Sequence, residues 1–291
     1  MMGLVLFAFV LTFVACSDPA PVSPHPAGKA NCVLCGFLGD DRYTIADGQG
    51  AHESPDSSSE TAAEADNTQS DSVVFADSNL ESVVRQVLDR PQGHLTPEDV
   101  ASLTWLKAES KNIQSLAGLQ HFTALQGLNL MDNQIADVGP LAGLIKLKTL
   151  NLKHNQIADV GPLAGLIKLK TLNLKHNQIA DVGPLANLKN LQTLNLDKNN
   201  PIRDLGPLAG LTNLKTLHLG RKIKNLGPLA GLTNLDFLNI QNNRIKSLAP
   251  LVANTGLSEG DEVHLTGNPL SDQSINKHIP ALRARGVTVH F

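Results

Sequence analysis

Leucine and isoleucine recur at fixed intervals through the middle of the chain, in the frame L-x-x-L-x-L-x-x-N-x-I-x-D-x-x-P-L-x-x-L. The first leucine of this frame recurs four times after 22 residues, then after 23 and after 21. Within each copy, two leucines separated by one residue predict a short strand with one apolar side. The first leucine occupies seven positions: Leu103, Leu125, Leu147, Leu169, Leu191, Leu214 and Leu235.

The fixed period predicts a repeat architecture. The 32 residues from Asn133 to Ala164 are identical to those from Asn155 to Ala186. One coil of this length cannot bury its own leucines, whereas stacked coils bury them against each other. The hydrophobic pattern therefore predicts a solenoid of stacked coils.

The frame resembles the leucine-rich repeat, and its I-x-D-[VL]-x-P-L-A-x-L tail is similar to that of the internalin and bacterial surface-protein subclass. The resemblance implies an α/β solenoid with a parallel β-sheet on the concave face and 3₁₀ turns on the convex face. It also implies that one asparagine per coil turns inward and satisfies backbone groups of adjacent coils. These asparagines are Asn133, Asn155, Asn177, Asn199 and Asn243.

Aspartates precede the Pro-Leu turn in four coils, where a short acceptor side chain can cap the turn. We favour this structural interpretation over calcium binding, which is the alternative. The four residues are Asp137, Asp159, Asp181 and Asp204.

The frame slips once and recovers. One extra residue stands between Asn199 and Ile202, and one is missing between Gly220 and Ile223, where the asparagine is also absent. We expect a local distortion of the solenoid there. A partner could contact this distortion, and sequence drift in an old repeat explains it equally well.

Residues 73–102 predict a helical N-terminal cap, which a solenoid needs to cover its apolar end. Asp77 or Ser78 can begin a first helix, and Thr96 followed by Pro97 predicts the start of a second. The first helix has one apolar face, formed by Leu80, Val83, Val84, Val87 and Leu88.

Seven repeats span residues 103–252, and residues 253–291 predict a C-terminal cap built from a helix and a strand. Ser271 to Arg285 predicts a helix that is interrupted near Pro280, and Gly286 can end it. Alternation after this glycine predicts a closing strand with three apolar positions, namely Val287, Val289 and Phe291.

Residues 1–15 have the features of a signal peptide, because the apolar run from Leu4 to Val14 is too short to span a membrane. The segment ending in Cys16 resembles a bacterial lipobox, which implies that Cys16 is lipidated and becomes the mature N-terminus. We therefore expect export to the cell envelope or outer surface, with ordinary secretion as the alternative. Residues 16–72 are rich in serine, proline, alanine and acidic residues and predict a disordered acidic tether.

Cys32 and Cys35 form a C-x-x-C motif within this tether. We expect a local disulfide, since export places the pair in an oxidising compartment. A redox motif would need a βαβ context that the sequence lacks. A zinc site would need two further ligands at a recognisable spacing.

Charge is distributed unevenly along the chain. Residues 1–102 carry 4 basic and 15 acidic side chains, whereas residues 103–252 carry 17 basic and 8 acidic ones. The basic repeats favour an acidic partner or a weak attraction to the tether. A solvated charged surface is the alternative.

The residues between and beside the strand leucines face the concave side, and strands ~4.8 Å apart give seven coils a face about 30 Å long. Parallel stacking brings Lys153 above Lys175 and His154 above His176, which predicts a positive centre. The two histidines could bind a metal, but a titrating surface pair is the interpretation we favour, so we assign no metal site. The candidate ligand-binding residues are Trp105, Lys107, Asn129, Asn151, Lys153, His154, Asn173, Lys175, His176, Lys198, His218, Phe237 and Asn239.

These features predict a monomeric exported binding protein that recognises a protein or an acidic glycan through its concave face and needs no cofactor. The sequence shows no nucleophile–base set, phosphate loop or acidic pair, so we do not expect an enzyme. A structural envelope component without a discrete ligand and a redox protein using the cysteine pair are the alternatives. We expect no nucleic-acid binding, because stacking aromatics are few, and membrane contact only through the lipid anchor.

Overall fold

The computed structural model describes residues 72–199 and 202–291. The predicted signal peptide, Cys16, the tether and the pair Cys32 and Cys35 lie outside the described residues. Within the described part, no helix is both long and apolar enough to cross a membrane.

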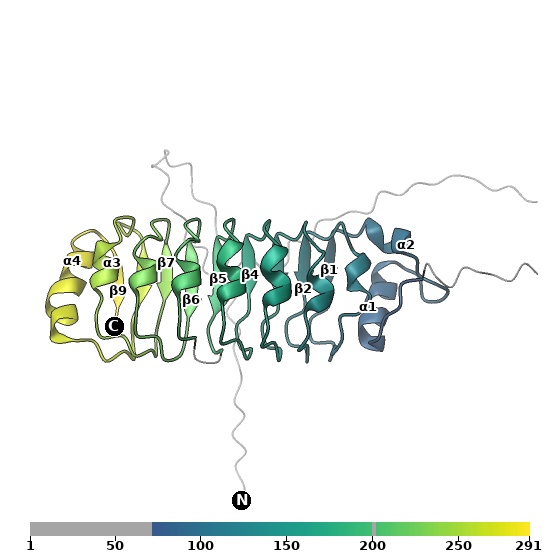
Figure 1. Cartoon of the computed structure of the whole chain (residues 1–291), viewed down its shortest axis with the longest axis horizontal. Coiled ribbons are helices and arrows are strands. Elements are labelled where there is room, and N and C mark those ends of the chain that lie inside the picture. Colours follow the sequence, from purple (N-terminus) through teal and green to yellow (C-terminus); the bar gives the residue numbers. More distant parts are fainter. Residues whose placement is uncertain (1–71, 200–201) are drawn as a thin grey trace, which may run out of the picture. The chain divides into compact units, whose positions relative to one another are not determined.

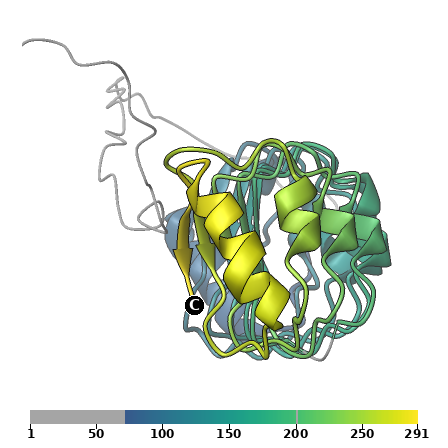
Figure 2. The same ribbon diagram turned by 90° about the vertical axis from the view of Figure 1, so that its left-hand side faces the viewer.

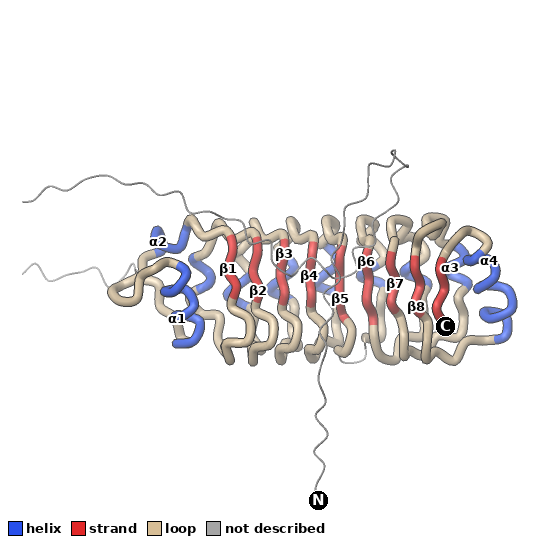
Figure 3. Tube along the Cα trace, turned by 180° about the vertical axis from the view of Figure 1, so that it is seen from behind, coloured by secondary structure: helices blue, strands red, loops and turns tan. Residues whose placement is uncertain are grey.

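Nine short strands form one parallel sheet, and their order in the sheet is their order in the chain (Figure 3). Neighbouring strands pair without a register shift, so that Leu128, Leu150 and Leu172 lie side by side. The strands are β1 (Trp105–Lys107), β2 (Gly127–Asn129), β3 (Thr149–Asn151), β4 (Thr171–Asn173), β5 (Thr193–Leu196), β6 (Thr216–Leu219), β7 (Phe237–Asn239), β8 (Glu262–His264) and β9 (Thr288–His290).

Short 3₁₀ turns follow the strands and lie on the opposite side of the coils (Figures 1 and 2). Most begin at Gly-Pro-Leu, where proline already has the backbone angle that a helical turn needs. The predicted α/β solenoid is therefore confirmed. The turns are η2 (Leu119–His121), η3 (Gly139–Leu141), η4 (Gly161–Gly165), η5 (Gly183–Asn187), η6 (Gly206–Leu208) and η7 (Gly227–Leu229), and the α-helix α3 (Ala249–Ala253) takes this place in the next coil.

Aliphatic side chains from successive coils share one interior. In the copied coil, Leu150 from the strand, Ile157 from the following loop and Leu163 from the turn are all fully buried. The same positions are fully buried in the coil before and the coil after it. Removing this apolar surface from water is the main driving force for stacking the coils.

One asparagine per coil forms hydrogen bonds to backbone groups of its own coil and of the coil before it. The amide of Asn155 donates to the carbonyls of Leu130 and Leu152 at 3.0 and 3.1 Å, and its Oδ1 accepts from the N–H of Ile135 at 3.0 Å. Asn177 repeats this pattern one coil later. The inward asparagines implied by the resemblance are therefore confirmed, and we call this series the asparagine ladder.

The aspartates before the Pro-Leu turns cap them, as predicted. Oδ1 of Asp137 and Oδ1 of Asp159 accept from the backbone N–H two residues later, each at 2.7 Å. Asp181 and Asp204 make the same bond, and Asn225 replaces the aspartate in the following coil. An amide oxygen serves this position as well as a carboxylate does, which agrees with a structural role.

Two helices precede the sheet in the described part of the chain. The helix α1 (Ser78–Val87) begins at Asp77, whose side chain accepts from the N–H groups of Asn79 and Leu80. The helix α2 (Pro97–Ala101) begins at Thr96, which forms a reciprocal capping box with Asp99. The buried face of α1 includes Leu80, Val83 and Val84.

The C-terminal segment covers the other end of the sheet with a helical stretch and β9. A π-helical turn (Ser274–His278) passes directly into α4 (Ile279–Arg283), so the predicted interruption near Pro280 is wrong. Pro280 has no N–H to donate into the preceding turn, and that turn has π-helical bonding, in which the N–H of Ile279 donates to the carbonyl of Ser274. The predicted closing strand is present as β9, with Val289 buried.

The slip in the frame changes a turn and leaves the sheet intact. Arg221 and Lys222 both have a positive φ, at 68° and 66°, whereas each of the four coils before this one has a single such residue here, namely Asp132, His154, His176 and Lys198. The strands β5, β6 and β7 still pair in register across the fault. Residues 200–201 lie outside the described part of the chain.

The asparagine ladder predicts a large effect from one substitution. Asn155→Ala leaves the N–H of Ile135 without its partner and removes one of the two asparagine donors from each of the Leu130 and Leu152 carbonyls, which should lower the free energy of unfolding by about 1–3 kcal/mol. Urea denaturation followed by circular dichroism measures this loss. The exposed neighbour provides the control, because Gln156→Ala should leave the midpoint unchanged. Equal midpoints for both variants would contradict a role for the ladder in stability.

Candidate ligand-binding face

The strand register places the outward-facing residues in two straight columns on the concave face. One column runs through Trp105, Gly127, Thr149, Thr171, Thr193, Thr216, Phe237, Glu262 and Thr288. The other runs through Lys107, Asn129, Asn151, Asn173, Asn195, His218, Asn239, His264 and His290. The columns expected from the frame are thus the columns observed.

The asparagines of the second column are largely occupied with their own backbone. Asn151 and Asn173 are 3 and 7% exposed, and Asn129 is 8% exposed. Oδ1 of Asn151 accepts from the N–H of Lys153 at 3.2 Å, and the same bond recurs at Asn129, Asn173 and Asn239. These residues fix the edge of each strand, so their contact with a ligand stays a prediction.

The centre of the face carries cationic side chains on adjacent coils. Backbone hydrogen bonds continue past the strands here, since the N–H of His154 donates to the carbonyl of Lys175 at 2.8 Å. This pairing places each lysine and histidine beside its copy in the next coil. We call Lys153, His154, Lys175, His176 and Lys198 the central basic patch.

Carboxylates balance part of this patch. Nζ of Lys175 lies 3.1 Å from Oδ2 of Asp197, and Nδ1 of His154 lies 2.7 Å from Oδ1 of Asp132. Lys153 and Lys198 form no ion pair with any described residue. The patch therefore has two lysines whose charge is not balanced by a direct contact.

The two histidines of the patch pack edge to face, with ring centroids 4.1 Å apart. Burial lowers the pKa of His176 below its usual value, and the neighbouring His154, Lys175 and Lys198 lower it further. His176 therefore adds no positive charge to the patch at neutral pH. His176 contributes a neutral imidazole.

Trp105 lies at the β1 end of the face and is 41% exposed. Its ring lies against the backbone of Gly127 on the next strand, because a Cβ built there would be 1.7 Å from ring carbons. The next four coils carry threonine at this position, namely Thr149, Thr171, Thr193 and Thr216. Gly127 thus makes room for a flat aromatic surface that is held in place and open to a ligand.

Rings line the other end of the face. Phe237 packs between His218 and His264, at centroid distances of 5.1 and 5.0 Å, and His264 stacks on His290 at 4.3 Å. His218 is 7% exposed and its Nε2 is buried without a hydrogen-bond partner in the described structure. Burial is the main cause that lowers the pKa of His218 to about 4, so this residue is neutral under physiological conditions.

Sequence reasoning missed two features of this face. It did not connect Gly127 with Trp105, although glycine in a column of threonines is a signal of close packing. It also did not bring Glu262 and His290 together with His264, because β9 lies outside the 22-residue frame. The alternating Glu-x-His and Thr-x-His segments could have indicated that these side chains share one face.

Comparisons with known proteins agree with this architecture. A family model described as Leucine Rich repeats (2 copies) matches residues 123–165, 167–210 and 212–253. Among curated proteins, no sequence matches the chain. The chain is a leucine-rich repeat protein.

Solved structures narrow the class. Internalin C2 from Listeria monocytogenes is 37% identical over 75% of this chain and 95% of that one, with a TM-score of 0.67. Internalin InlF from the same organism is 32% identical over 74% of this chain and 63% of that one, also with a TM-score of 0.67. A plant peptide hormone receptor, RGFR1 in complex with RGF2, shares the fold alone, at 23% identity over 60% and 30% of the chains and a TM-score of 0.51. The chain belongs to the internalin-like leucine-rich repeat proteins.

His218 makes stability depend on pH. In the unfolded chain this histidine takes up a proton near pH 6.5, but in the folded protein it does so only near 4. Its contribution to stability is therefore complete above pH 6.5 and is lost as the pH falls towards 4, by about 3 kcal/mol in all. Denaturant titrations of wild type and His218→Asn at several pH values measure this difference.

Most other coils have asparagine at the strand position of His218. The substituted asparagine should therefore fit this position, and it has no group that titrates. The stability of His218→Asn should fall less between pH 6.5 and 4 than that of wild type. Parallel losses in the two proteins would show that His218 does not titrate as described.

Gly127→Thr should displace the Trp105 ring, because the new Cβ occupies its position. Trp105 is the sole tryptophan of the chain, so intrinsic fluorescence reports on it directly. We expect emission to shift to longer wavelength as the ring moves into water. The reverse exchange in the next coil, Thr149→Gly, should leave the emission unchanged. An unshifted spectrum for Gly127→Thr would mean that the ring is not held on Gly127.

Proposed function

We propose that this chain is an exported binding protein that recognises an acidic surface of a protein partner through the central basic patch. Leucine-rich repeat proteins of the internalin and receptor kinds are scaffolds that bind proteins. The observation that carries the proposal is the position of Lys153 and Lys198 on an open face, without a carboxylate partner among the described residues.

The ion pairs of the patch can exchange partners at little cost. Lys175 and Asp197 are each about a third exposed, at 32 and 31%. Exposed ion pairs contribute little to stability, ~0–1 kcal/mol. A carboxylate of a partner can therefore replace Asp197 beside Lys175 while Lys153 and Lys198 engage other acidic groups.

Trp105 supplies an apolar anchor outside the patch. Tryptophan is enriched among residues that dominate binding energy, since it buries a large area with few rotatable bonds. Its ring is held against Gly127, so little side-chain freedom is lost when a partner covers it. A partner that spans from β1 to the central coils would use both the ring and the lysines.

Reversing charge in the patch tests the proposal. Lys153→Glu with Lys175→Glu should weaken capture of the partner at least about tenfold, because attraction becomes repulsion. Affinity purification with the full chain as bait, followed by equilibrium binding of the protein recovered, measures this effect. Binding should also weaken as ionic strength rises.

The matched control makes the same change on the same two coils. Lys146→Glu with Lys168→Glu alters exposed lysines outside the strands and should leave affinity unchanged. An equal loss of affinity in both double variants would mean that only the net charge of the protein matters. Unchanged affinity in both would mean that the central basic patch is not part of the binding site. Binding of heparin instead of a protein, with the same dependence on Lys153 and Lys175, would favour an acidic glycan as partner.

The proposal includes export and attachment by a lipid on Cys16. Cys16→Ser should move the protein from the membrane fraction to the soluble fraction, since the diacylated cysteine would be the anchor. Mass spectrometry of the mature N-terminus checks the modification directly. A wild-type protein that is soluble, with an unmodified N-terminus, would support ordinary secretion and exclude the anchor.

A further inference from the structure

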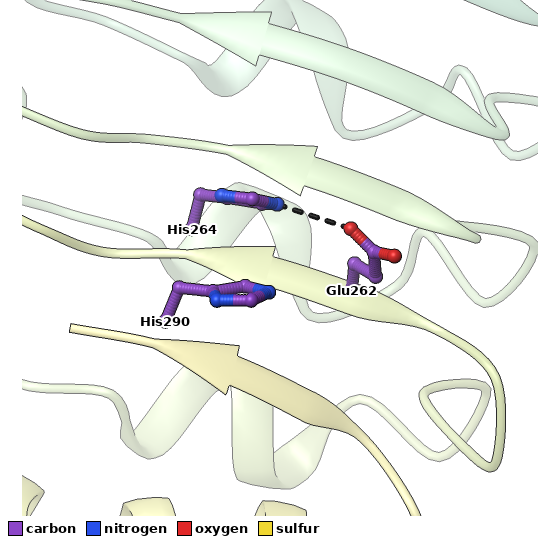
Figure 4. A group of neighbouring side chains, drawn as sticks. All are labelled: Glu262, His264 and His290. Atoms are coloured by element: carbon purple, nitrogen blue, oxygen red, sulfur yellow. Dashed lines mark hydrogen bonds and ion pairs between the residues drawn. The ribbon is translucent and has the colours of Figure 1, made fainter. Parts of the chain in front are cut away.

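The last two strands of the sheet bring together two histidines and a glutamate. The pairing of β8 with β9 sets His264 opposite His290. Glu262 precedes His264 by two residues on β8 and therefore lies on the same face. Figure 4 shows the two rings one above the other, with the Glu262 carboxylate beside their edges. Across the described residues, this is the one group of three such side chains that is close enough to hold a metal ion.

The distances are near those that a metal ion requires. Nε2 of His264 lies 3.1 Å from Oε2 of Glu262, and one ligand atom from each of the three residues lies within 4.8 Å of the others. A tetrahedral zinc ion about 2.0–2.2 Å from each ligand sets these atoms roughly 3.5 Å apart. A shift of about 1 Å in the side chains, with a tilt of the two stacked imidazole rings that turns both nitrogens toward one point, would therefore complete the site.

The surrounding structure holds the ligands in place. The Phe237 ring packs on one face of the His264 ring and the His290 ring stacks on the other, with 21° between the two imidazole planes. The guanidinium of Arg283 donates to the carbonyl of Val289, which fixes the strand that carries His290. Ligands on strands are positioned better than ligands on loops.

We propose that Glu262, His264 and His290 form a binding site for a divalent transition-metal ion of the zinc kind. Two imidazole nitrogens and one carboxylate oxygen form a ligand set that zinc accepts, and calcium and magnesium prefer oxygen ligands alone. Three protein ligands leave one position of a tetrahedral ion open. Because the three side chains are all partly or fully exposed, water or a donor group of a bound partner could fill that position.

The test uses the full chain, with Cys16, Cys32 and Cys35 replaced by serine so that thiolates do not bind the metal. Zinc affinity is measured by competition with a chromophoric chelator. His264→Ala, His290→Ala and Glu262→Gln should each weaken binding at least about tenfold, a loss typical even of residues that only support a ligand. With cobalt as the probe, the parent should show visible absorption of a nitrogen- and oxygen-ligated ion, which the variants lack.

The central basic patch supplies the matched control. His154 and His176 are also in contact on adjacent coils, and Asp132 lies beside His154, but among the described residues these three side chains are not all close enough to one another to hold a metal ion. His154→Ala with His176→Ala should keep the affinity of the parent. Loss of affinity in this control, or equal affinity in the parent and His290→Ala, would overturn the proposal. His290 is exposed on the last strand, so this variant is expected to fold, and circular dichroism verifies that it does.

Discussion

Hydrogen bonding of the buried backbone between coils is the constraint on which the rest of the structure depends. The 3₁₀ turns and short strands leave carbonyl and N–H groups inside the solenoid that no regular secondary structure pairs. A buried group left in that state costs about 1–3 kcal/mol, which is large beside the stability of a whole domain. Asn155 and its equivalents satisfy three such groups each, two of them in a neighbouring coil.

This constraint couples the coils in register. Because each asparagine contacts both its own coil and the preceding one, a shift by one residue would break the contacts of two coils at once. The sheet keeps its register even where Gly220 to Ile223 lacks a residue and the asparagine. The absence of the ladder asparagine lowers stability only locally there, since the leucines of β5, β6 and β7 still align.

Because the register is fixed, the position of a residue in the repeat determines its place on the concave face. Much of the structure can therefore be predicted from the repeat pattern. The columns containing Trp105 and Lys107, the inward asparagines and the capping aspartates could all be derived from the repeat. The helical stretch through Pro280 could not, because a proline that ends a helix and a proline that follows a π-helical turn look alike in the sequence. The burial of His218 also escaped prediction, since its column is exposed at Lys107 and buried at Asn151.

The same register explains why chemical character changes along the face. In the copied coils, duplication places identical residues beside each other on adjacent coils. Lys153 therefore lies beside Lys175, and the centre of the face is cationic. At β8 and β9 the frame has ended, and the neighbours there differ in kind: Glu262 and His264 on one strand meet His290 on the next. Lysines at the centre attract anions, whereas imidazole nitrogens beside a carboxylate form a ligand set for a cation. One scaffold thus presents two surfaces of different chemistry, because its interior holds the strands in register where the repeat is regular and where it is not.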